Sequence, residues 1–358
     1  MARFIKTLKK TALAASIASL ATVANATIVT SIKPLGFIAS SIADGVTDTE
    51  VLVPAGASPH DYSLKPSDIQ KLQGAELILW VGEDIDAFLD KTLRPMPFKK
   101  VLSIADFAEI GGLLEGEAHD HKHEHDHKHD HAHKHDHDHK HDHDHKHEHD
   151  HKHDHAHKHD HDHKHDHDHK HDHDHKHDHA HEHDHDHSTN WHVWYSPEIS
   201  KIVATRLATR LTEAYPEKKA KIAQNLAEFN RTLAEQSEKI KQQLAPVKEK
   251  GFYVFHDAYS YFNNAYGLKQ TGYFTINPLV APGAKTLAKI KQEIKAHKVN
   301  CLFAEPQFTP KVIESLSKGT GVHVGRLDPM GDAVKLGVNS YANFLQYTAD
   351  SYFACLSK

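Results

Sequence analysis

Histidines dominate the chemistry that this sequence could perform. The chain of 358 residues contains 40 histidines, and 35 of them occupy every odd position from His119 to His187. The other five stand in otherwise ordinary sequence: His60, His192, His256, His297 and His323. Neutral imidazole is a common ligand for zinc, copper and nickel. The chain therefore contains one dense tract with metal-binding chemistry and five single histidines that must be judged one by one.

The tract His119–His187 has too little apolar surface to form a packed element. Its even positions are Asp, Glu, Lys or Ala, so nothing larger than alanine could be buried to offset the entropy of ordering the backbone. We expect a disordered segment that offers many exchangeable metal sites, with a solvated polar linker as the alternative. The tract carries a formal charge of −11 with neutral histidine. Protonation near the reference pKa of about 6.5 would reverse that sign and eject metal in mild acid.

The first 26 residues have the pattern of a secretory signal peptide. Four basic residues precede an apolar run from Thr11 to Val23, which ends at the small-residue sequence Ala24-Asn25-Ala26. No cysteine follows this site to carry a lipid, and no later apolar run is long enough to span a membrane. We expect an exported, soluble mature chain without membrane insertion.

Outside the leader and the tract, 263 residues remain, enough for two lobes, and their formal charge is near +1. No basic face indicates nucleic acid as a partner. The only cysteines, Cys301 and Cys355, suit an oxidising compartment, and we expect a disulfide between them. Two free thiols are the alternative.

Strand and helix patterns alternate along the rest of the chain, which favours α/β lobes with mostly parallel sheets. Strands are predicted at 28–32, 49–53, 77–81, 251–255, 273–276, 299–304 and 323–327. Apolar residues at helical spacing predict one helix over 216–245, about 45 Å long at 1.5 Å per residue. We interpret it as a rigid bridge between an N-terminal lobe, 27–215, interrupted by 119–187, and a C-terminal lobe, 246–358.

Several polar residues follow predicted strands, where open α/β sheets bind their ligands. They are His60, His256, Glu305 and Asp328. His192 stands where the chain re-enters the first lobe after the tract. Spacing alone leaves these three histidines open between metal ligands and ordinary loop or strand-end residues, whereas His297, on a polar helix face, and His323, inside a strand, are interpreted as structural.

Five motifs together resemble the periplasmic zinc-binding proteins of high-affinity zinc ABC transporters, and the resemblance covers essentially the whole mature chain. These motifs are Ala57-Ser58-Pro59-His60-Asp61-Tyr62, His192-Val193-Trp194-Tyr195-Ser196-Pro197, Phe255-His256-Asp257-Ala258-Tyr259, Phe303-Ala304-Glu305-Pro306-Gln307-Phe308 and Leu327-Asp328-Pro329. The family implies two lobes joined by a rigid helix, with Zn²⁺ in the cleft between them as transported ligand. It also implies a monomer in the periplasm that delivers the ion to an inner-membrane ABC permease.

Carried over position by position, the resemblance implies His60, His192 and His256 as zinc ligands. Manganese-selecting relatives have a carboxylate at the place of His256, and imidazole there favours zinc. Asp328 sits where relatives supply an acidic ligand, so the fourth position is open between Asp328 and water. Glu305 is interpreted as a residue behind the ligands or at a strand end.

Other functions remain as alternatives. Three histidines with an open fourth position also describe zinc hydrolases, with Glu305 as a base, although no hydrolase motif is present. An adhesin-type interaction protein and a manganese or nickel transporter are the further alternatives. We expect a binding protein and no enzyme.

Overall fold

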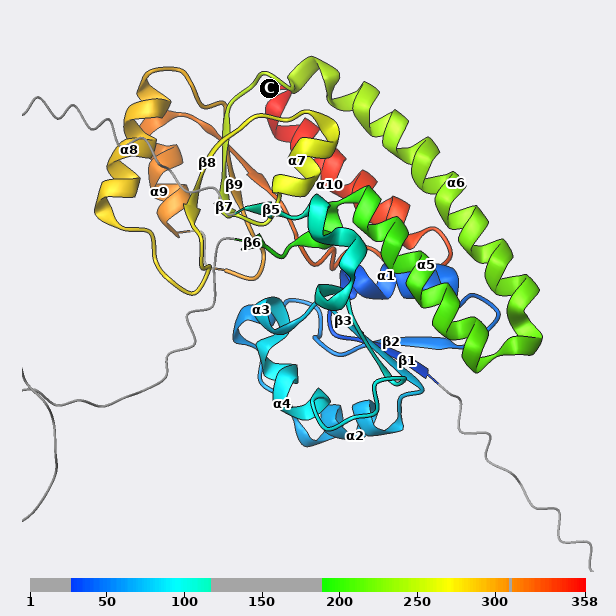
Figure 1. Cartoon of the computed structure of the whole chain (residues 1–358). Coiled ribbons are helices and arrows are strands. Elements are labelled where there is room, and N and C mark those ends of the chain that lie inside the picture. The colour runs from blue at the N-terminus through cyan, green and yellow to red at the C-terminus, as the bar shows by residue number, and fades with distance from the viewer. Residues whose placement is uncertain (1–26, 117–188, 309–310) are drawn as a thin grey trace, which may run out of the picture. The chain divides into compact units, whose positions relative to one another are not determined.

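The computed structural model of the chain describes residues 27–116, 189–308 and 311–358 (Figure 1). The predicted signal peptide, 1–26, and the histidine tract, 119–187, lie outside the described residues. Within the described ranges, no helix combines the length and the apolar character that a membrane span requires.

A parallel four-stranded sheet forms the first lobe, in the order β2-β1-β3-β4. Its strands are β1 (Thr27–Thr30), β2 (Asp48–Val51), β3 (Leu77–Trp80) and β4 (Val101–Ser103). All four residues of β3 are buried, as expected for a central parallel strand that is covered on both faces.

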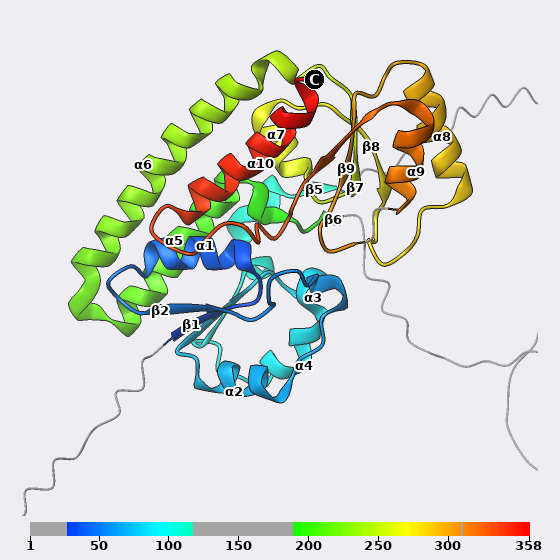
Figure 2. The ribbon, with the colours of Figure 1, turned by 180° about the vertical axis from the view of Figure 1, so that it is seen from behind.

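Helices cover both faces of this sheet. Figures 1 and 2 show α1 (Lys33–Ile42) on one side and α2 (Pro66–Gly74) with α4 (Asp90–Leu93) on the other. The short helix α3 (Glu83–Asp86) follows β3. Because successive side chains of a strand point to opposite faces, Ile28 belongs to the core on the α1 side and Val29 to the core that Leu72 of α2 completes.

A second parallel sheet, in the order β10-β9-β7-β8, forms the other lobe. Its strands are β7 (Phe252–His256), β8 (Gln270–Thr275), β9 (Cys301–Ala304) and β10 (His323–Arg326). Helices α8 (Ala284–Lys295) and α9 (Lys311–Thr320) lie on one side, and α7 (Ser260–Tyr266) and α10 (Ser340–Leu356) on the other (Figures 1 and 2). The predicted α/β class with two parallel sheets is confirmed.

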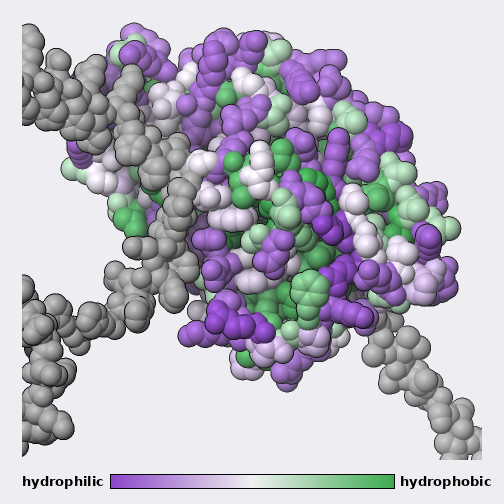
Figure 3. Space-filling view, viewed as in Figure 1, coloured by the Kyte–Doolittle hydropathy of each residue, from purple (hydrophilic) through white to green (hydrophobic). Residues whose placement is uncertain are grey.

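The longest helix, α6 (Lys219–Leu244), follows α5 (Pro197–Ala214) and has 26 residues, about 39 Å at 1.5 Å per residue. It is shorter than the predicted 216–245, because Pro216–Lys218 form a separate 3₁₀ turn. Near its start, the Asn225 amide donates to the Ile42 and Asp44 carbonyls. Near its end, Ser237 is hydrogen-bonded to Tyr266 of α7. Helix α6 therefore contacts both lobes, and hydrophilic residues predominate along the surface that it forms (Figure 3).

The two chain segments on either side of the tract pair with each other as strands. Strands β5 (Glu115–Gly116) and β6 (Thr189–Asn190) form a short antiparallel ladder, with Gly116 opposite Thr189. The Tyr261 hydroxyl donates to the Asn190 carbonyl at 2.6 Å and accepts from the Glu115 amide at 3.0 Å. Both ends are thus fixed to each other and to α7.

The predicted disulfide is present. Cys301 of β9 and Cys355 of α10 are bonded, with their Cα atoms 6.2 Å apart, and no free cysteine remains. The bond ties the last helix of the chain to a central strand of the second sheet.

Reduction of this disulfide is expected to lower the free energy of unfolding by about 4 kcal/mol, since the bond closes a loop with a separation of 54 residues. Urea unfolding with and without reductant measures the difference. A variant with Cys301→Ala and Cys355→Ala is the control, because its midpoint should not respond to reductant. Coincident midpoints for the native protein would contradict the prediction.

Candidate metal centre

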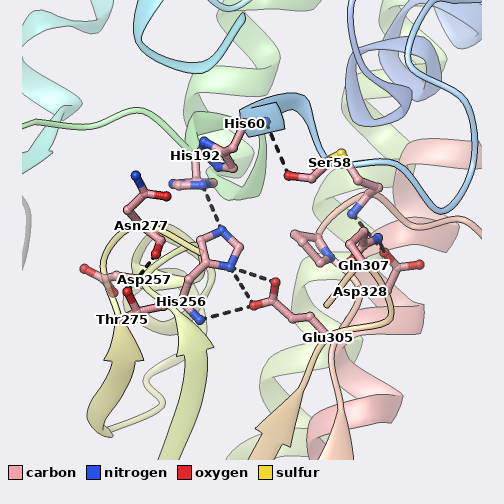
Figure 4. A network of polar contacts seen from close by, with 12 residues as sticks. Ser58, His60, His192, His256, Asp257, Thr275, Asn277, Glu305, Gln307 and Asp328 are labelled. Carbon is pink, nitrogen blue, oxygen red and sulfur yellow. Dashed lines mark hydrogen bonds and ion pairs between the residues drawn. The ribbon is translucent and has the colours of Figure 1, made fainter. Parts of the chain in front are cut away.

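Three of the five single histidines meet between the two lobes. His60 lies in the 3₁₀ turn Pro59–Asp61, whose start is fixed by the Ser58 hydroxyl accepting from the His60 amide at 3.3 Å. His192 follows β6 at the beginning of a 3₁₀ turn, and His256 is the last residue of β7. Figure 4 shows the three side chains gathered at one place.

Their nitrogen atoms lie close enough for one ion. One ligand atom from each of His60, His192 and His256 can be chosen so that all three lie within 4.8 Å of one another. The Nε2 atoms of His192 and His256 are 3.2 Å apart. Both rings are buried, whereas His60 is half-buried.

A carboxylate determines the tautomer of His256. Both oxygens of Glu305 lie 2.7 Å from His256 Nδ1, and the side chain of Glu305 has no exposed surface. An ionised carboxylate only accepts hydrogen bonds, so Nδ1 carries a proton, and in the neutral ring the lone pair is on Nε2. Donation to a carboxylate also makes the imidazole a stronger metal ligand.

The side-chain amide of Asn190 determines the tautomer of His192 in the same way. Asn190 uses its amide nitrogen to donate to the Asp257 carbonyl at 2.8 Å and to the Ser260 hydroxyl at 3.2 Å. Its oxygen therefore faces His192 and accepts from Nδ1 at 2.7 Å and from the backbone amide at 3.0 Å. The proton of His192 is then on Nδ1, and its Nε2 also carries a lone pair.

The two Nε2 lone pairs thus face each other at 3.2 Å. Two acceptor nitrogens at that distance are stabilised by a shared cation, either a proton or a metal ion. Together with His60, they form a set of three nitrogen donors suited to a divalent transition metal.

Burial keeps the imidazoles of His60 and His192 in the neutral form that binds metal. It lowers the pKa of His60 from 6.5 to about 3, with a further lowering from nearby His256. The pKa of His192 lies well below its ordinary value, first because of burial and then because of His256 and His60. Both rings are therefore deprotonated at neutral pH.

Asp328 does not belong to this group of three nitrogens. Its Oδ1 accepts from the Gln307 side chain at 2.8 Å and from the Met330 amide at 3.1 Å, and its Oδ2 accepts from the Asp332 amide at 2.7 Å. The carboxylate is thus engaged in holding the turn after β10.

The remaining two histidines lie away from the cluster. His297 is exposed in the turn after α8, with φ 56°, and not on a helix face as predicted, because α8 already ends at Lys295. His323 is the exposed first residue of β10, so the predicted strand position is confirmed.

Sequence reasoning did not identify Asn190. A single asparagine near a histidine has no recognisable spacing, and only its contacts with His192 and α7 reveal its role.

A cleft of about 350 Å³ opens beside the cluster. It is lined by His60, His192 and Asp84 from one part of the chain and by Asp257, Ile276 and Asn277 from the second lobe. Figure 4 shows Asp257 and Asn277 beside the histidines. The cluster therefore borders a cleft that both lobes line.

Two parallel α/β lobes with a histidine cluster in the cleft between them are the architecture of a metal-binding solute-binding protein. The family model of ZnuA, described as zinc-uptake complex component A, periplasmic, matches residues 28–355. The chain belongs to the ZnuA family.

Individual relatives agree with this assignment. The chain is 66% identical over 353 residues to the high-affinity zinc uptake system protein ZnuA of Haemophilus influenzae, covering 99% of each chain. It is 52% identical over 351 residues to the protein of the same description from Haemophilus ducreyi, covering 98% of this chain and 99% of that one. A crystal structure of ZnuA shares the fold with a TM-score of 0.64 at 21% identity, over 92% of this chain and 99% of the other.

Proposed function

We propose that this chain is the periplasmic solute-binding protein that captures Zn²⁺ and delivers it to an inner-membrane ABC permease for high-affinity zinc uptake. His60, His192 and His256 are the protein ligands. The observation that carries this proposal is the convergence of three imidazoles, two of which have their Nε2 atoms fixed toward each other by Glu305 and Asn190.

The donor set favours zinc over manganese. Imidazole suits zinc, whereas manganese prefers carboxylate and water oxygens. The two carboxylates that the sequence suggested near the metal have other partners, since Glu305 accepts from His256 and Asp328 accepts from Gln307 and two backbone amides. We therefore favour water over Asp328 as the fourth ligand.

A zinc hydrolase is the less favoured function. It needs a base beside the metal-bound water. Glu305, the candidate base, lies behind His256 on the Nδ1 side, whereas the metal-binding nitrogen is Nε2. Turnover of simple ester, phosphate or peptide substrates by the zinc-loaded protein would overturn this preference.

The lobes that carry the ligands are 27–215 and 246–358, with 216–245 as the bridge. The contacts of helix α6 support its role as a rigid bridge, because it is hydrogen-bonded to Ile42 near one end and to Tyr266 near the other. In our proposal the protein acts as a monomer, and zinc release involves movements of loops around the cleft. The adhesin alternative is tested by deleting the gene: a growth defect confined to zinc-poor medium supports uptake.

We assign the histidine tract 119–187 the role of gathering zinc at many weak sites. Its end at His187 is five residues before His192 in sequence, and the β5–β6 ladder fixes both flanking segments. Zinc bound by the tract would thus be brought close to the cleft.

Deleting residues 119–187 is expected to leave one tight zinc site per protein in calorimetric titration, because the paired ends Gly116 and Thr189 can be joined by a short turn. Loss of all tight binding in a folded deletion protein would mean that the tract is the main site.

Zinc titration of the full chain in mild acid is the control for the deletion. At about pH 5.5 tract histidines with a reference pKa near 6.5 are mostly protonated, whereas His60, with a pKa of about 3, is not. The many weak sites should therefore be lost while one site remains.

A further inference from the structure

Gln307, two residues after Glu305, is oriented by an acidic neighbour. Its Nε2 donates to Asp328 Oδ1 at 2.8 Å. A carboxylate accepts hydrogen bonds, so the amide nitrogen faces Asp328. The amide oxygen, Oε1, therefore points away from that carboxylate.

This oxygen is a buried acceptor that the protein itself does not use. Gln307 Oε1 is shielded from solvent and has no hydrogen-bond partner among the residues that the structure describes. Leaving a buried acceptor unpaired is unfavourable, and a bound water or ion is the usual explanation.

Gln307 and the three histidines line one small cavity. Its volume is about 10 Å³, room for a single water molecule. Apart from the histidines, Gln307 and Ser58, the wall consists of Phe308, Met330 and two prolines. The wall of the cavity thus includes one side-chain amide and one hydroxyl beside the converging histidines.

We infer that Gln307 positions the fourth ligand of the metal, a water molecule that binds the ion through its oxygen and donates a hydrogen bond to Gln307 Oε1. This inference rests on the zinc site proposed above and identifies what completes it. Three protein nitrogens leave one position of a tetrahedral zinc ion open. Asp328 then contributes indirectly, because it holds the amide of Gln307 in the orientation that presents Oε1 to the water.

An acceptor at this place also selects the ligand. Water and hydroxide have a proton to donate to Oε1, whereas chloride does not and would face the oxygen as a second acceptor. Gln307 thus favours water at a position that a halide could otherwise take.

The direct test is the structure of the zinc-loaded mature protein. We expect an oxygen about 2.0–2.2 Å from zinc and within hydrogen-bond distance of Gln307 Oε1. A fourth ligand from a side chain such as Asp328, or an oxygen out of reach of Gln307, would overturn the inference.

The second test uses one equivalent of Co²⁺, which fills the tightest site of the full chain first and gives intense visible bands when four-coordinate. In Gln307→Leu we expect one site with an affinity about three- to tenfold lower, shifted bands, and a spectrum that responds to added chloride. Gln292→Leu, the same change at an exposed position of α8, is the matched control. Unchanged affinity, bands and chloride response in a folded Gln307→Leu protein would contradict the role of Gln307.

Failure of this inference can be told from failure of the proposed function. If the wild-type protein has no tight site, or if zinc is not bound by the three histidines, the proposed function fails. If the three histidines bind zinc but no water bridges the ion and Gln307, only the present inference fails.

Discussion

Replacing His60 by alanine is expected to weaken zinc binding by about a hundredfold or more. Structural zinc sites with four ligands bind with roughly 10–16 kcal/mol, so one ligand accounts for a few kcal/mol, and each 1.4 kcal/mol changes the affinity tenfold. His60 is the cleanest of the three positions to change, because it is half-buried in a turn and its loss leaves Glu305 and Asn190 paired with their own histidines. Competition with a chelator, in the protein without residues 119–187, measures the affinity.

His297→Ala is the matched control, since this histidine is exposed and lies in the turn after α8.

The pH dependence of stability in the metal-free proteins provides a second comparison between His60→Ala and the wild type. Because the pKa of His60 is about 3 in the folded protein and near 6.5 when unfolded, acid below pH 6.5 protonates the unfolded chain first and lowers stability. His60→Ala lacks this contribution, so its stability should fall less steeply between pH 6.5 and 3. Unchanged zinc affinity in His60→Ala would remove His60 from the site.

Replacing Glu305 by glutamine is expected to weaken zinc binding by about ten- to a hundredfold, the usual cost of losing a carboxylate behind a metal-binding histidine. Glutamine preserves the shape and an oxygen that can accept from His256 Nδ1, but it removes the negative charge that strengthens the imidazole as a ligand. Because the amide oxygen can keep the hydrogen bond from His256 Nδ1, the stability of the metal-free protein should change little.

Zinc affinity and stability, measured on the same variant, distinguish the two interpretations of Glu305: a residue that supports the metal ligand His256, or one that stabilises a strand end. If the residue only stabilises the end of β9, the variant will unfold at lower temperature while its zinc affinity stays unchanged. Glu314→Gln, at an exposed position of α9, controls for the change of net charge. Calorimetry of the metal-free protein and chelator competition give the two quantities independently.

The lobes and their sheets could be predicted because local patterns determine them. Buried runs such as Leu77–Trp80 and Phe252–His256 have no solvated face and are readily recognised as parallel strands. Helix α6 was predicted with an error of a few residues at its start, since Pro216 permits either a first helical turn or a separate 3₁₀ turn. Helices α7 and α9 were not predicted, since their seven and ten residues give helical spacing few turns in which to show. Helix α10 was also not predicted, and its buried face mixes serine, threonine and alanine with the large apolar residues.

The candidate ligands were identified by resemblance, since spacing alone left His60, His192 and His256 open. No short motif joins residues that are separated by 132 and 64 positions. Their convergence follows from the fold, in which turns from the two lobes meet at one cleft.

By itself, the sequence determined the α/β class, the single disulfide and the presence of a histidine tract, because each depends on local composition or on a unique pair of cysteines. Only the tertiary structure decided which nitrogen of each histidine faces its neighbours. Glu305, which follows β9, fixes the tautomer of His256, and Asn190, two residues before His192, is itself oriented by Asp257 and Ser260. It also decided that the Asp328 carboxylate holds Gln307 and a turn. Hydrogen bonds between distant segments leave no periodic trace in a sequence, and therefore the partners behind the histidines appear only when the chain is folded.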